Sequence, residues 1–204
     1  MQASTGVAPS GLRERKKERT RQAIIQAALD LYRERGYEGV TVGEIARRAD
    51  IAPRTFFGYF ESKEDVFLGP GDDRLERVIR AIRERGSGVP ILAAVQPELL
   101  PRHQSRREPR SPAGPGFPQL LRQPAVRNRL RERWNRWEDE LAVVIASEVG
   151  AAAADPEPRV LAAVVIAAIR VAADAAGAQP ARREEVAGRV FKLIASGLAD
   201  YGRT

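Results

Sequence analysis

The 204-residue chain contains no cysteine and a single histidine, His103. Disulfides and thiolate metal sites are therefore excluded, and one histidine is too few for a multi-histidine metal site. No apolar run reaches the roughly 20 residues that a membrane-spanning helix requires. The N-terminus lacks the apolar core of a signal peptide, and its first basic cluster also contains Glu14 and Glu18. We therefore expect a cytoplasmic protein with no metal, no cofactor and no membrane partner.

Catalytic motifs are missing as well. An enzyme of the common classes needs a nucleophile–base pair, a metal cluster or a phosphate-binding loop. Here the one histidine lies in a Pro/Arg-rich region, and no Walker or dinucleotide-binding glycine pattern occurs. No long alternation of apolar and polar residues predicts a strand. The chain is thus predicted to be all-α and not an enzyme.

Positive charge is in excess, with a formal net charge of +7, and this balance favours a polyanionic partner such as nucleic acid. Two regions carry most of it. Residues 13–21 (RERKKERTR) have a net charge of +4, and they form either a phosphate-binding arm or a solvated helix face with acid–base pairs. Residues 102–136 have a net charge of +8. We do not expect this second region to bind the nucleic acid. Alternatively, it binds an anionic ligand, such as a nucleotide or a coenzyme A phosphate.

The N-terminal third has the signals of several helices. After a small, polar tail over 1–12, an apolar stripe predicts a helix that starts at Arg13 and ends at Gly36. A capping box, Thr41 to Glu44, begins a second, short helix. The third helix has Pro53 at a position that suits a helix start, and SKED from residue 62 opens a fourth helix. A helix, a tight turn and a helix after a longer helix are typical of a helix-turn-helix unit.

The third helix, predicted from Pro53 to about Tyr59, has the composition of a recognition helix. Arg54 can reach guanine or phosphate, and Thr55 offers a hydroxyl to a base edge or phosphate and a methyl to thymine. Phe57 and Tyr59 lie on a different face from the aromatic pair expected to pack inward, Phe56 and Phe60. We expect these outward rings to pack on the sugar–phosphate backbone.

The sequence TVGEIARRADIAPRTFFGYFESKEDVF, with the RG-Y-x-x-V-T pattern that leads into it, resembles the DNA-binding signature of the tetracycline-repressor (TetR) family over about residues 19–68. The resemblance implies phosphate contacts by Thr41, Tyr59 and Lys63, and base or backbone contacts by Thr55. Phe57 stands where the family commonly has tyrosine, which removes a hydroxyl donor. Ala52 replaces the usual serine before the recognition helix, which weakens the cap there. The family also implies a variable helical ligand domain.

Beyond Gly69 the pattern predicts helices near 75–86, 91–100, 130–148, 159–176 and 182–201. Residues 101–118 are rich in Pro, Arg, Ser and Gly and are predicted to form a long flexible loop. We therefore expect three parts: a disordered tail (1–12), a helix-turn-helix DNA-binding domain (13–60), and a helical ligand-binding and dimerisation domain (61–204) that includes the loop.

Three residues of the C-terminal part are candidate ligand contacts. Trp134 and Trp137 are either core residues or pocket walls. Arg170 lies in an apolar helix, where it either pairs with Asp174 one turn later or anchors a ligand carboxylate or phosphate.

Apolar and small residues of the last two predicted helices exceed what one chain can cover, which favours a homodimer. The candidate interface residues are Val164, Val186, Val190, Ile194 and Gly197.

The sequence thus predicts a dimeric, sequence-specific DNA-binding transcriptional regulator. By the resemblance, it is a repressor that an unidentified small-molecule effector releases from a palindromic double-stranded operator, because ligand and DNA binding are linked. An activator is the alternative within this class. A sequence-neutral DNA-packaging protein is the alternative outside it, since charge alone binds DNA without discrimination. The compact signature and the apolar C-terminal helices favour the regulator.

Overall fold

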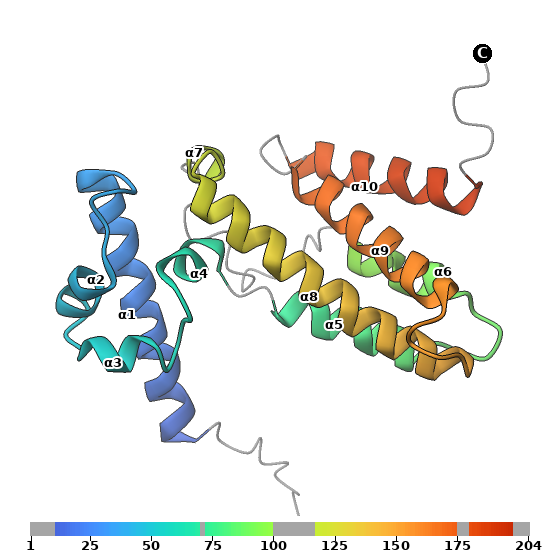
Figure 1. Cartoon of the computed structure of the whole chain (residues 1–204), viewed down its shortest axis with the longest axis horizontal. Helices are drawn as coiled ribbons and strands as arrows, with labels where there is room; N and C mark the ends of the chain where they lie inside the picture. Colours follow the sequence, from blue (N-terminus) through green and yellow to red (C-terminus); the bar gives the residue numbers. More distant parts are fainter. Residues whose placement is uncertain (1–10, 70–71, 100–116, 175–179, 198–204) are drawn as a thin grey trace, which may run out of the picture. The chain divides into compact units, whose positions relative to one another are not determined.

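The computed structural model describes residues 11–69, 72–99, 117–174 and 180–197. Within these ranges the chain is helical, from α1 to α10, and has no strand (Figure 1). This confirms the all-α prediction. Almost all of the expected tail over 1–12 and loop over 101–118 lies outside the described residues. The chain divides into two compact units, and the first ends at Gly69.

Unit 1 is built around a long first helix. It contains α1 (Leu12–Arg35), α2 (Val42–Arg48), α3 (Pro53–Phe56) and α4 (Lys63–Leu68). Helix α1 packs against α2 and α4, and α2 packs against α3. The predicted stripe on α1 is buried, and it meets apolar residues of the other three helices. The fully buried residues at the centre of this unit are Ile24, Ala28, Val40, Ile45, Ala46, Phe56, Val66 and Phe67.

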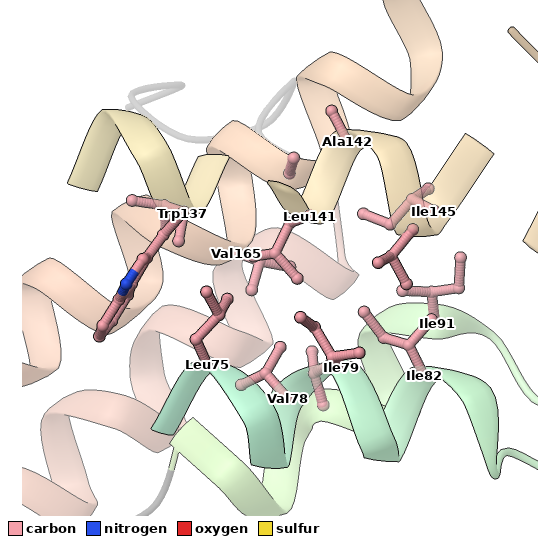
Figure 2. Close-up of a cluster of buried hydrophobic side chains, with 14 of the residues drawn as sticks. Leu75, Val78, Ile79, Ile82, Ile91, Trp137, Leu141, Ala142, Ile145 and Val165 are labelled. Carbon is pink, nitrogen blue, oxygen red and sulfur yellow. The ribbon is translucent and has the colours of Figure 1, made fainter. Parts of the chain in front are cut away.

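Unit 2 contains α5 (Asp72–Arg83), α6 (Ile91–Leu99), α7 (Phe117–Leu120), α8 (Pro124–Val149), α9 (Pro156–Asp174) and α10 (Pro180–Ala195). Helix α8 packs against α9 and α5, and α10 packs against α9. Figure 2 shows the core, in which Leu75, Val78 and Ile82 of α5 face Leu141 and Ile145 of α8. The helical periodicity thus found α5, α6, α8, α9 and α10, whereas α7 begins within the segment that we expected to be loop.

Helix α4 belongs to unit 1, although we expected the DNA-binding domain to end at residue 60. The reason is Phe67, which is fully buried and contacts the rings of Tyr32 and Tyr37 at centroid distances of 5.8 and 6.1 Å. These aromatic contacts hold α4 on α1. Within the described ranges, no helix is long and apolar enough to span a membrane.

Candidate nucleic-acid interface

The second helix of the motif starts at a capping box. Thr41 Oγ1 accepts a hydrogen bond from the Glu44 backbone N–H at 3.2 Å, as predicted. The Glu44 carboxylate reaches back to the Thr41 hydroxyl, which donates to Oε2 at 3.0 Å. Because this hydrogen bond favours the charged form, with Arg35 and Arg47 nearby, the pKa of Glu44 is lowered. The exposed Thr41 side chain is therefore held at a fixed position at the start of α2.

The turn between α2 and α3 depends on Asp50. This residue has a φ of 53°, in the left-handed region that aspartate tolerates better than most residues. The Ile51 N–H donates to Ala46 O at 3.0 Å and the Asp50 N–H donates to Arg47 O at 3.3 Å, which is the pair of bonds of a Schellman motif. The motif ends α2 abruptly and lets Pro53 begin α3 after only four residues.

Helix α3 is shorter than predicted, because it ends at Phe56 and not near Tyr59. After Phe56 the hydrogen bonds Gly58 N–H to Thr55 O (3.1 Å) and Tyr59 N–H to Phe56 O (2.9 Å) span three residues, as in a tighter 3₁₀-type turn. Phe56 and Phe60 are buried, as predicted, with ring centroids 5.8 Å apart. They anchor the residues between them to the core of unit 1. We call residues 53–60 the recognition segment.

The outer face of the recognition segment carries polar and aromatic groups. Arg54 is exposed, Thr55 and Tyr59 are half-buried, and the Phe57 side chain is 58 % exposed. Burying the exposed Phe57 ring in a complex would be favourable. This face therefore offers a cation, two hydroxyls and a ring to a partner, on a short helix that its own core holds in place.

Lys63 has partners within unit 1. Its Nζ donates to Val40 O at 2.9 Å and to Tyr37 O at 3.4 Å, and it lies 4.1 Å from the centroid of the Tyr37 ring. The Tyr37 hydroxyl donates to Glu64, and burial together with this bond raises the pKa of Tyr37. Lys63 was predicted to pair with a phosphate. In the structure it joins the start of α4 to the loop between α1 and α2 by these hydrogen bonds.

One contact of this region could not be predicted from sequence spacing. Arg48 forms a two-bond pair with Glu34, at 2.6 and 2.8 Å, across 14 residues. The Arg48 guanidinium lowers the pKa of Glu34 through these bonds. The pair joins the last residue of α2 to α1 and fixes the helix that precedes the recognition segment.

The candidate ligand residues of unit 2 separate into different environments. Trp137 is 5 % exposed and belongs to the core (Figure 2). Half-buried Trp134 packs edge-on against it, with ring centroids 5.1 Å apart. Arg170 is exposed on α9, and the side chain of Asp174 lies outside the described residues. Over the described ranges, no three His, Cys, Asp or Glu side chains gather in a possible metal site.

The candidate dimer residues also differ in their surroundings. Val190 and Ile194 of α10 are half-buried against the core of their own unit, so part of the predicted stripe is used within the chain. Val164 and Val186 are half-buried, and Gly197 is exposed with a φ of +76°. Among the described residues, α9 has two further exposed apolar side chains, Val160 and Val171.

Comparisons with known proteins match both parts of the chain. Residues 24–69 match the model of bacterial regulatory proteins of the tetR family, and residues 116–199 match the model of the MftR C-terminal domain. The HTH-type transcriptional regulator TcmR of Streptomyces glaucescens is 44 % identical over 85 residues, which are 42 % of this chain. The matched segment spans only 38 % of the length of TcmR.

The fold is shared with a solved structure over most of the chain. Salmonella enterica GusR aligns with 87 % of this chain and 94 % of its own, with a TM-score of 0.50 and 21 % identity. A transcriptional regulator from Rhodococcus sp. Rha1 aligns with 87 % of this chain and 96 % of its own, with a TM-score of 0.43 and 22 % identity.

Proposed function

Because the chain belongs to the TetR family and is a DNA-binding transcriptional regulator, not an enzyme, we propose that it is a repressor that a small molecule releases from its operator. The observation that carries the proposal is the recognition segment. Its inner rings, Phe56 and Phe60, are buried, while Arg54 and Phe57 are exposed beside half-buried Thr55. A short helix with an anchored apolar face and an outward polar face fits the major groove.

Each outward group has a chemical role in this proposal. Arg54 donates to a guanine edge or a phosphate, and Thr55 contacts a base edge by its hydroxyl or its methyl. Tyr59 donates to a phosphate, and Thr41 does so once its hydroxyl proton turns from Glu44 to the DNA. These contacts fix the register but carry no sequence information. Phe57 packs on the sugars, since it has no hydroxyl to donate.

The proposed operator is palindromic because the proposed regulator is a homodimer. On α9, Val160 is 61 % and Val171 is 44 % exposed, and half-buried Val164 lies one helical turn after Val160. A second copy would cover these valines, together with Val186 and Gly197, across a two-fold axis. Val190 and Ile194 contribute less, because they already pack on their own core. Two recognition segments would then enter major grooves one helical turn, about 34–36 Å, apart.

The proposed effector binds unit 2 and acts through α4. This helix is the last element before unit 2 begins, and Phe67 and Lys63 hold it to α1 and its loop. A movement of α4 would therefore carry the recognition segment with it. If the effector favours the arrangement that fits the operator less well, it weakens DNA binding by linkage. Trp134 and Arg170, which keep accessible surface, are the proposed effector contacts.

A gel-shift titration on the DNA that flanks the gene, with excess bulk competitor DNA, tests the proposal. The proposal expects a discrete complex that survives the competitor and is lost in the double variant Thr55→Ala/Tyr59→Ala. Lys192→Ala, an exposed residue of unit 2, is the matched control and should bind as the unaltered protein does. Smeared, competitor-sensitive binding that the double variant leaves unchanged would instead indicate a charge-driven packaging protein.

A further inference from the structure

The first three turns of α1 extend beyond the core of unit 1. Every residue from Leu12 to Arg19 is exposed, and the first buried residue of the helix is Ile24. The segment stays helical because Leu, Arg, Lys and Glu are good helix formers. We call residues 12–21 the basic arm. At 1.5 Å per residue it is about 15 Å long.

Four cations of the basic arm have no acidic partner within the part of the chain that the structure describes. Arg13, Lys16, Lys17 and Arg19 have no ion pair with any described residue. Glu18, one of the two acids of the arm, instead accepts a hydrogen bond from Gln22 at 2.6 Å. These four cations outnumber the two acids of the arm, which favours a phosphate-binding arm over a solvated face balanced by acid–base pairs.

The arm leaves the core of unit 1 beside the recognition segment. The Arg21 guanidinium carbon lies 5.6 Å from the centroid of the Phe60 ring, and Phe60 is the last residue of that segment. Arg21 Nε is buried and has no hydrogen-bond partner among the described residues. The guanidinium lies within the range of a cation–π contact with Phe60. In Figure 1 the N-terminal end of α1 continues past α3. Lys17 lies one turn before Arg21 and hence on the same face of the helix.

We infer that the basic arm is a second DNA-binding element, which binds the phosphates of the duplex next to the bases that the recognition segment reads. This inference rests on the proposed DNA-binding role of that segment. Its length of about 15 Å corresponds to roughly four base pairs of axial rise at 3.4 Å per step. Its cations point around the helix, so they bind phosphates without reading bases and add affinity but no sequence preference.

The test compares the unaltered protein with the arm variant Arg13→Gln/Lys16→Gln/Lys17→Gln. A control variant, Arg80→Gln/Arg83→Gln/Arg159→Gln, removes the same charge from exposed positions of unit 2. Binding to one selected duplex is titrated at several salt concentrations, and hydroxyl-radical footprints are recorded. Each lost phosphate contact lowers the slope of log K against log salt by about 0.9, so three lower it by about 2.7 per chain.

The inference expects a smaller slope and at least tenfold weaker binding at low salt for the arm variant only. It also expects protection of about four base pairs beside the central footprint to disappear, while the preferred sequence stays the same. Equal binding by the two variants, whether both are weakened or neither, would overturn the inference and leave the recognition segment untouched. If even the unaltered protein forms no discrete complex, the proposed function fails, and the inference fails with it.

Discussion

Replacing Lys63 by methionine distinguishes two roles for this residue, a contact with a DNA phosphate and a stabilising contact within unit 1. Methionine keeps much of the aliphatic chain and removes the ammonium group, which donates to Val40 O at 2.9 Å and lies 4.1 Å from the Tyr37 ring centroid. Hydrogen bonds from charged groups contribute about 1.5–3 kcal/mol, and a part-buried site takes the lower end. A cation over an aromatic ring adds about 0.5–1 kcal/mol. We expect unit 1 to lose about 2 kcal/mol of stability without DNA present.

Native-state hydrogen exchange measures this loss in the correct unit. Both tryptophans lie in unit 2, so tryptophan fluorescence would report the wrong part of the chain. The most protected amides of α1 and α4 should exchange roughly 30-fold faster in Lys63→Met, since 1.4 kcal/mol is a factor of ten. Lys16→Met removes an exposed ammonium from the same unit and should leave these rates unchanged. Unchanged exchange in Lys63→Met, together with weaker DNA binding, would refute the internal role and support the phosphate contact.

Three further changes test other parts of the structure. Gly39→Ala should destabilise unit 1 by about 1–3 kcal/mol, because the new methyl would lie 2.6 Å from the Arg35 Cβ of α1. Urea unfolding followed by far-ultraviolet circular dichroism measures this loss. The control Gly43→Ala, with open space around the new methyl, should not lower the stability. The Thr41 hydroxyl lowers the pKa of folded Glu44 below its usual 4.5. The stability that the Glu44 carboxylate contributes is therefore complete at pH 6 and is lost as the pH falls through the folded pKa. The Glu44→Gln variant, which lacks this carboxylate, should show a flatter decline in melting temperature between pH 5 and 3. Arg85→Met should destabilise unit 2 by about 1–3 kcal/mol, because it removes hydrogen bonds to Ile82 O of α5 (2.6 Å) and to the Glu148 carboxylate of α8 (2.7 Å). Unfolding followed by tryptophan fluorescence measures this loss. Equal stability of the two proteins would show that these bonds contribute nothing.

Local signals in the sequence predicted most of the fold. The Thr41 and Ser62 caps begin α2 and α4 as expected, because a hydroxyl that satisfies a free N–H three residues on is a short-range event. Gly36, with a φ of +70°, lies directly after α1 for a similarly local reason. The stripes of α5 and α8 face one another in the core, since helical periodicity fixes which residues share a face.

Contacts between distant residues were beyond such signals. The Arg48–Glu34 pair and the engagement of Lys63 by the α1–α2 loop depend on how helices cross, and no spacing rule gives that. The same holds for Val190 and Ile194, whose apolar character is equally compatible with a second subunit and with their own core. The length of α3 was overestimated because the aromatic spacing of Phe56 and Phe60 is satisfied by a tighter turn as well as by a helix.

The central claim, that the recognition segment reads sequence, is tested most directly by selecting bound duplexes from a random DNA pool. The account predicts that the unaltered protein enriches one palindromic sequence with half-sites about one helical turn apart. Thr55→Ala/Tyr59→Ala should enrich no sequence, although its fold and net charge are retained. Enrichment of the same sequence by the double variant, or of none by the unaltered protein, would contradict the account.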